Sequence, residues 1–136
     1  MNKNTELDTI VTEFNSTLID FSKNIATIFP SSLIGNNLNL IVSILNSKEP
    51  DTKHKIMHTF ICKILPYKNK IDEGDETFFL TKSFNDDTGD SNILNNIFEI
   101  KSLWKQLNDN NKKYVIQYMQ LLCEISQEYY ICYNKK

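Results

Sequence analysis

The chain has 136 residues, 40% of them hydrophobic and 24% charged, which is typical of one soluble globular domain. Its formal net charge is −2, and all fifteen basic residues are lysines. This balance disfavours nucleic acid as a partner, the lack of arginine excludes bidentate guanidinium contacts, and no apolar run approaches the roughly 20 residues that span a bilayer.

Apolar periodicity predicts a first helix over residues 5–29. Its inward positions alternate spacings of three and four: Leu7, Val11, Phe14, Leu18, Phe21, Ile25 and Ile28. Asn4 or Thr5 can cap its start, and Pro30 ends it. Core packing is the preferred interpretation of this stripe, ahead of a coiled-coil seam.

Two further helices are predicted before residue 66. The second begins near residues 31–37 and ends at Pro50, with an inner face of Leu38, Ile41, Val42 and Leu45. The third takes Asp51 as its cap and is stopped by Pro66. Its inner face is Ile56, Met57, Phe60, Ile61, Ile64 and Leu65.

Residues 67–92 break the helical pattern, because they contain two of the three glycines and seven acidic residues. This composition predicts a long, mobile acidic loop, with room for one short turn that buries Phe78, Phe79 and Leu80.

A fourth helical stretch can start at Ser91, and it carries Ile93, Ile97, Ile100, Trp104 and Leu107. After a turn capped by Asn108 or Asp109, the last helix covers residues 110–133. Its stripe is Tyr118, Leu122, Ile125, Tyr129 and Cys132. Further apolar side chains broaden that stripe, so this helix is expected to have neighbours on several sides.

These elements predict an all-α fold. We expect one domain over residues 1–136, a bundle of five to six helices with the mobile acidic loop at 67–92. The residues expected to matter most for the core are Phe14, Phe21, Trp104, Leu122 and Tyr129.

The stretch HKIMHTFIC makes His54, His58 and Cys62 the candidates for metal ligands, because they recur every four residues on the third helix. Successive side chains rotate by about 40° around the helix axis, so the three cannot close around one ion by themselves. Residue 55 is a lysine, so the general base of the zinc proteases is missing as well. We therefore predict no metal and place these residues on a half-solvated border of the helix.

No catalytic residue and no cofactor is predicted, so we expect a protein that is not an enzyme. Both histidines share a helix with Cys62, and three scattered glycines provide neither a phosphate loop nor a calcium loop. The three cysteines are odd in number and contain no C-x-x-C pair, which indicates reduced thiols. The first nine residues lack a signal peptide's apolar segment, so secretion is not expected.

Three segments carry a resemblance. LWKQLNDNNKKYVIQYMQLLCEIS (103–126), FSKNIATIFP (21–30) and DETFFL (75–80) resemble patterns in uncharacterised small helical proteins of nucleocytoplasmic large DNA viruses. The resemblance implies a giant-virus origin, which the composition rich in Asn, Ile and Lys also suits, and a place in the host cytoplasm or the viral factory. It transfers no activity and no catalytic residues.

The predicted function is non-enzymatic: a protein-interaction or assembly module that binds a host or viral protein through an apolar surface or groove. Trp104, Tyr130 and Tyr133 are the candidate interaction residues. Three alternatives remain open. The first is a peptide-binding bundle like the viral apoptosis inhibitors, although the Gly–Arg pair typical of their groove is missing. The others are a structural homo-oligomer and a metal-binding regulatory protein that uses His54, His58 and Cys62.

Overall fold

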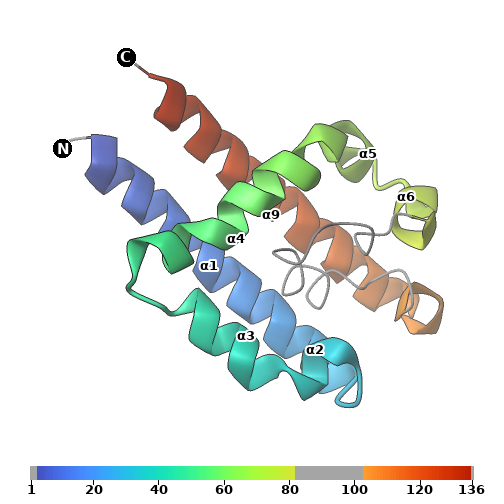
Figure 1. Cartoon of the computed structure of the whole chain (residues 1–136). Helices are drawn as coiled ribbons and strands as arrows, with labels where there is room; N and C mark the ends of the chain where they lie inside the picture. The colour runs from blue at the N-terminus through green and yellow to red at the C-terminus, as the bar shows by residue number, and fades with distance from the viewer. Residues whose placement is uncertain (1–2, 82–102, 136) are drawn as a thin grey trace.

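Two long antiparallel helices form the centre of the protein. The computed structural model describes residues 3–81 and 103–135, and in it α1 (Lys3–Ile28) lies along α9 (Asp109–Asn134) (Figure 1). Glu6 lies beside Cys132 at one end of the pair, and Asn24 beside Tyr118 towards the other. The two ends of the chain therefore lie on the same side of the molecule.

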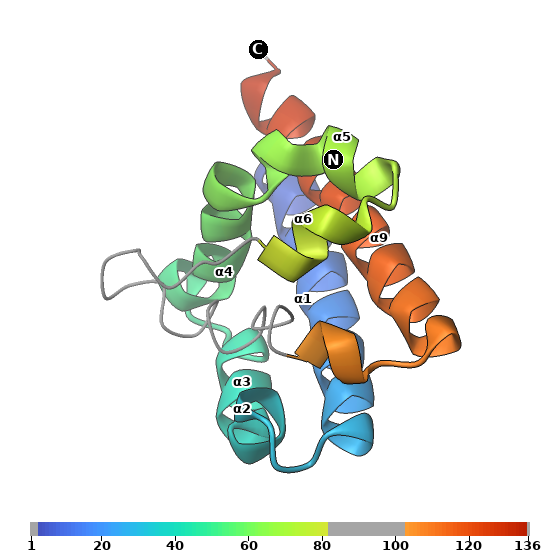
Figure 2. The same cartoon turned by 90° about the vertical axis from the view of Figure 1, so that its right-hand side faces the viewer.

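The remaining elements pack around this pair, and they differ in which of the two central helices they contact. They are α2 (Leu33–Asn36), α3 (Leu38–Leu45), α4 (Pro50–Lys63), the 3-10 turn η1 (Leu65–Tyr67), α5 (Lys68–Asp72), α6 (Glu76–Thr81) and the 3-10 turn η3 (Trp104–Gln106). The helices α2 and α3 pack along α1, α4 crosses both central helices, and α5 packs on α9, while α6 contacts η3 (Figure 2).

The all-α prediction is confirmed. The described residues contain seven α-helices and no strand, and their buried apolar side chains form one core. The five expected core residues Phe14, Phe21, Trp104, Leu122 and Tyr129 are all buried, with at most 4% of their surface exposed. The predicted stripe of α1 is buried from Leu7 to Ile25, and only Ile28 at its end is exposed.

The loop predicted over residues 67–92 is wrong for its first part, because α5 and α6 occupy that region. Gly74 adopts a left-handed φ of +65° and closes α5: its N–H donates to the Ile71 carbonyl at 3.0 Å, and Asp75 N–H donates to Lys70 at 3.1 Å. This pair of bonds is a Schellman helix end, which glycine favours. The buried side chains of Ile71 and Phe78 then anchor the two short helices. The rest of the predicted loop, residues 82–92, lies outside the described residues, as do Ser91, Ile93, Ile97 and Ile100.

Helix boundaries follow the caps at some positions and depart from them at others. Asn108 caps α9 as predicted, its side-chain oxygen accepting from Asn111 N–H at 2.8 Å. Asp51 is not the cap of α4, because the helix begins one residue earlier at Pro50, where a missing N–H costs nothing. Thr5 lies inside α1 and does not cap it. In the described ranges, no helix combines the length and hydropathy needed to cross a membrane.

Candidate functional site

The three candidate metal ligands do not converge. His54 and His58 both face the phenol of Tyr129 on α9: His58 Nε2 lies 2.8 Å from the Tyr129 hydroxyl, and His54 Nδ1 lies 3.5 Å from it. Cys62 is exposed. Among the residues that the structure describes, no group of three His, Cys, Asp or Glu side chains is placed to hold a metal ion. His54, His58 and Cys62 are therefore not a ligand set.

The two histidines instead connect three helices. A phenol carries one proton, so Tyr129 can donate to one imidazole and must accept from the other. On its far side, His54 Nε2 lies 3.7 Å from the Asp8 carboxylate of α1, which also accepts from Lys53 Nζ at 2.8 Å. The resulting contacts run from α1 through α4 to α9, at the end of the bundle where both chain ends lie.

One carboxyl group and one imidazole of this cluster have pKa values below their usual range. The Lys53 ammonium lowers the pKa of Asp8 by hydrogen bonding to the carboxylate. Partial burial lowers the pKa of His58, and the nearby charge of His54 acts in the same direction. His58 is therefore a neutral hydrogen-bonding group at neutral pH, which suits a contact that holds α4 to α9.

Trp104 is not an interaction residue at the surface, because only 1% of it is exposed. Its Nε1 donates to Glu76 Oε1 at 2.8 Å, and the same oxygen accepts from Lys112 Nζ at 3.0 Å. The hydrogen bond from Lys112 lowers the pKa of Glu76 most, and the hydrogen bond from Trp104 lowers it as well. The indole therefore belongs to the core and fixes α6 against the N-terminal turn of α9.

Tyr130 and Tyr133 are exposed, as an interaction surface requires, with 54% and 57% of their surface accessible. They border a hollow of about 300 Å³ between α4 and α9, lined by His58, Ile61, Cys62, Tyr129, Tyr130, Tyr133 and Asn134. The ring of Tyr133 stacks on that of Tyr129, with centroids 6.2 Å apart.

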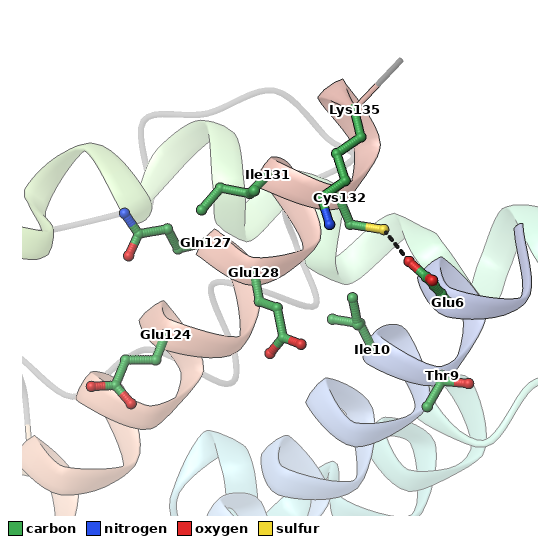
Figure 3. A pocket seen from close by; sticks show the side chains of 9 residues that line it. All are labelled: Glu6, Thr9, Ile10, Glu124, Gln127, Glu128, Ile131, Cys132 and Lys135. Carbon is green, nitrogen blue, oxygen red and sulfur yellow. Dashed lines mark hydrogen bonds between the residues drawn. The ribbon is translucent and has the colours of Figure 1, made fainter. Parts of the chain in front are cut away.

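A larger hollow of about 450 Å³ lies between α1 and α9 (Figure 3). We call it the α1–α9 groove; it is lined by Glu6, Thr9, Ile10, Glu124, Gln127, Glu128, Ile131, Cys132 and Lys135. Ile10 and Cys132 are buried, whereas 54% of Ile131 is exposed. The Cys132 thiol donates to Glu6 Oε2 at 3.3 Å across the groove. The groove thus has an apolar floor and a mostly acidic rim.

Sequence patterns did not indicate this groove. Glu124 and Glu128 are four residues apart on one helix, which a sequence shows, but Glu6 joins them only because α1 and α9 pack antiparallel. Likewise, nothing in the sequence pairs the histidines of α4 with Tyr129. The one available signal was the excess width of the apolar face of the last helix, which is more than the bundle covers.

Comparisons with protein-family models, with curated proteins and with solved structures give no match.

Proposed function

We propose that this protein is a non-enzymatic interaction module, which binds another protein through the C-terminal half of α9 and the groove that α9 forms with α1. The carrying observation is that α9 keeps large apolar side chains at the surface beside hollows on two of its sides. Leu121, Tyr130, Ile131 and Tyr133 are between 42% and 57% exposed. Exposed apolar side chains gathered on one element are typical of protein-binding surfaces.

The reactive side chains support a non-enzymatic role. Both imidazoles are engaged with Tyr129, and burial raises the pKa of the Cys123 thiol to about 12, so that thiol is not a nucleophile at neutral pH. The hollow that includes the exposed Cys62 is lined by three tyrosines, Tyr129, Tyr130 and Tyr133, and by four other residues. Nucleophilic catalysis needs a base beside the nucleophile and a group that orients the base, and the Tyr129 cluster has the character of a helix-packing contact.

The test compares two substitutions that are matched in exposure. Ile131 of α9 and Leu40 of α3 are both 54% exposed, so Ile131→Asp and Leu40→Asp should perturb folding to a similar, small extent. Tagged full-length protein and both variants are used for affinity capture from the cells that produce the protein, after circular dichroism has shown that each variant folds.

We expect one stoichiometric partner with the wild type and with Leu40→Asp, and its loss with Ile131→Asp. If the two variants retain or lose the partner equally, α9 is not the binding surface. If the wild type is recovered alone, the interaction function is wrong. The viral origin of the chain and the apoptosis-inhibitor-like and homo-oligomer alternatives stay predictions, since no observation favours one of them specifically. The geometry of the described residues gives the metal-binding alternative no support, because His54, His58 and Cys62 do not converge.

A further inference from the structure

We infer that the α1–α9 groove binds a basic amphipathic helix of a partner protein. This inference rests on the proposed function and gives the partner a chemical class. Two antiparallel helices leave a seam between their side chains, and a third helix can pack into such a seam with its ridges in the groove. The lining residues of α9 begin at Glu124, and Lys135 just after the helix is the last of the set. This stretch spans about 17 Å along the helix axis, which is the length of three turns of a bound helix.

The apolar floor of the groove is complementary to an apolar face on the bound helix. The side chain of Ile10 points into the space between the helices, and the Cys132 sulfur lies opposite it at the Glu6 carboxylate (Figure 3). Ile131 stands at the rim with about half of its surface exposed. One or two aliphatic side chains, spaced three or four residues apart, would bury these surfaces and displace water from the floor.

The acidic rim of the groove is complementary to positive charge on the bound helix. Its ionisable residues are three carboxylates, Glu6, Glu124 and Glu128, and one ammonium, Lys135. Glu124 and Glu128 are exposed, and neither forms an ion pair with any residue in ranges 3–81 and 103–135. A cation near Glu124 is Lys68, whose pKa is raised by Asp72 first and, more weakly, by the charge of Glu124. Lysine or arginine on both flanks of an apolar face would therefore meet carboxylates that form no close ion pair within the described residues, which steers association and selects against acidic helices.

Charge also argues against two other occupants. A symmetric dimer of this chain through the groove would bring the carboxylates of one copy against the same carboxylates of the other, which repel. The segment 82–102 of the same chain contains two lysines and four acidic residues, so its charge does not complement the rim. An acidic rim likewise disfavours nucleic acid and anionic lipid.

The experiment uses three synthetic peptides of about 18 residues, long enough to form helix on binding. The first has leucines at helical spacing with lysines on both flanks. The second keeps the leucines and replaces the lysines by glutamates. The third has the composition of the first in scrambled order. Binding of labelled peptide to the full chain is measured by fluorescence anisotropy, for the wild type, for Glu124→Gln/Glu128→Gln, for Ile131→Asp and for Leu40→Asp as the control.

We expect only the basic amphipathic peptide to bind. Its affinity should fall about three- to tenfold with Glu124→Gln/Glu128→Gln and at least about tenfold with Ile131→Asp, and Leu40→Asp should leave it unchanged. For the wild type and the basic peptide, raising the salt concentration from about 0.1 M to about 1 M should also weaken binding, because it shortens the Debye length from about 10 Å to about 3 Å.

Each other result overturns the inference in a different way. Equal binding of the basic and acidic amphipathic peptides, with sensitivity to Ile131→Asp, would keep the groove as a helix-binding site and reject its charge preference. Binding of the scrambled peptide would show a general polycation effect. No binding of any peptide rejects the basic helix but leaves the proposed function to its own capture experiment. A concentration-dependent dimer in sedimentation, lost with Ile131→Asp, would assign the groove to a second copy of the chain.

Discussion

The two central helices have the same length, 26 residues each, and each has an apolar stripe that its sequence shows, yet they differ in how much of their apolar surface the fold covers. On α1, the only large apolar side chain left exposed is Ile28, at the last position of the helix. On α9, Tyr114, Leu121, Tyr130, Ile131 and Tyr133 are all more than 40% exposed. The difference teaches that an apolar stripe of ordinary width on α1 is covered by packing, whereas the wider apolar face of α9 leaves large side chains exposed.

The first half of α9 sharpens this comparison, because α5 and the side chains of Trp104 and Glu76 pack on one flank of it while Tyr114 on the same half stays exposed. The largest expected effect is at Trp104, whose ring is buried and bonded to Glu76. Trp104→Ala should lower the free energy of unfolding by about 3–5 kcal/mol, because it leaves a large cavity. Denaturant titration measures this loss, and a shift that cannot be detected would show that the indole is exposed.

Two adjacent leucines on α9 test whether burial or helix membership decides stability. Leu122 is 0% exposed, and its neighbour Leu121 is 42% exposed. Leu122→Ala should cost about 2–5 kcal/mol, whereas Leu121→Ala should change the free energy of unfolding by about 0.5 kcal/mol or less. Equal losses at the two positions in chemical denaturation would mean that the apolar side of α9 is also covered, and the comparison with α1 would fail.

The segment that follows α1 makes a close backbone contact with α2. A Cβ on Gly35 would lie 2.3 Å from the Pro30 carbonyl oxygen and 2.7 Å from that of Phe29. Gly35→Ala should therefore lower stability by about 1–3 kcal/mol, because the two segments must move apart. Thermal unfolding measures the loss.

Gly74 provides the control for this prediction. Glycine is favoured at this position by the left-handed backbone conformation, whereas there is room for a side chain. A Cβ there would meet its nearest neighbour, Ile116, at an ordinary 3.9 Å. Gly74→Asn should be tolerated better than Gly74→Ala, since asparagine adopts left-handed backbone more readily. Gly35→Asn should be at least as harmful as Gly35→Ala. A rescue of Gly35 by asparagine would contradict the steric explanation.

The smallest expected effect is the pH dependence of the contact between α4 and α9. The pKa of His58 is lowered in the folded protein, so the unfolded chain binds the proton more tightly. The stability that this contact contributes is complete above the unfolded imidazole's pKa of about 6.5 and is lost as the pH falls below it. As the pH is lowered from about 8 to about 5, the melting temperature should fall less steeply for His58→Gln than for the wild type. Parallel plots of melting temperature against pH for the two proteins would contradict this assignment.

Below that range, two carboxylates are protonated: Asp8, which lies in the same cluster as His58, and Glu76, which lies beside Trp104. The pKa values of Asp8 and Glu76 are both lowered in the folded protein, by Lys53 and by Lys112 respectively. The stability from these contacts is present above about pH 4–5 and is lost on further acidification. This loss should be seen with the wild type and with His58→Gln alike, which separates it from the titration of His58.

Particular residues show how far the sequence could be interpreted. The stripe from Leu7 to Ile25, the cap at Asn108 and the burial of Trp104 followed from spacing and from side-chain size. The helices α5 and α6 were missed, because a glycine between acidic residues was interpreted as part of a loop, although it ends a helix. Trp104 was also named as an interaction candidate, and its size alone could not distinguish a core residue from a surface anchor.

The sequence by itself determined that the segments of α1, α4 and α9 are helical and which of their side chains mostly turn inward, because the period of 3.6 residues is a local property of the chain. Only the tertiary structure decided which apolar residues of α9 stay exposed, that His54 and His58 meet Tyr129, and that Glu6 joins Glu124 and Glu128 at one groove. These pairings join residues more than 70 positions apart, and they depend on how the helices cross, which no local pattern specifies.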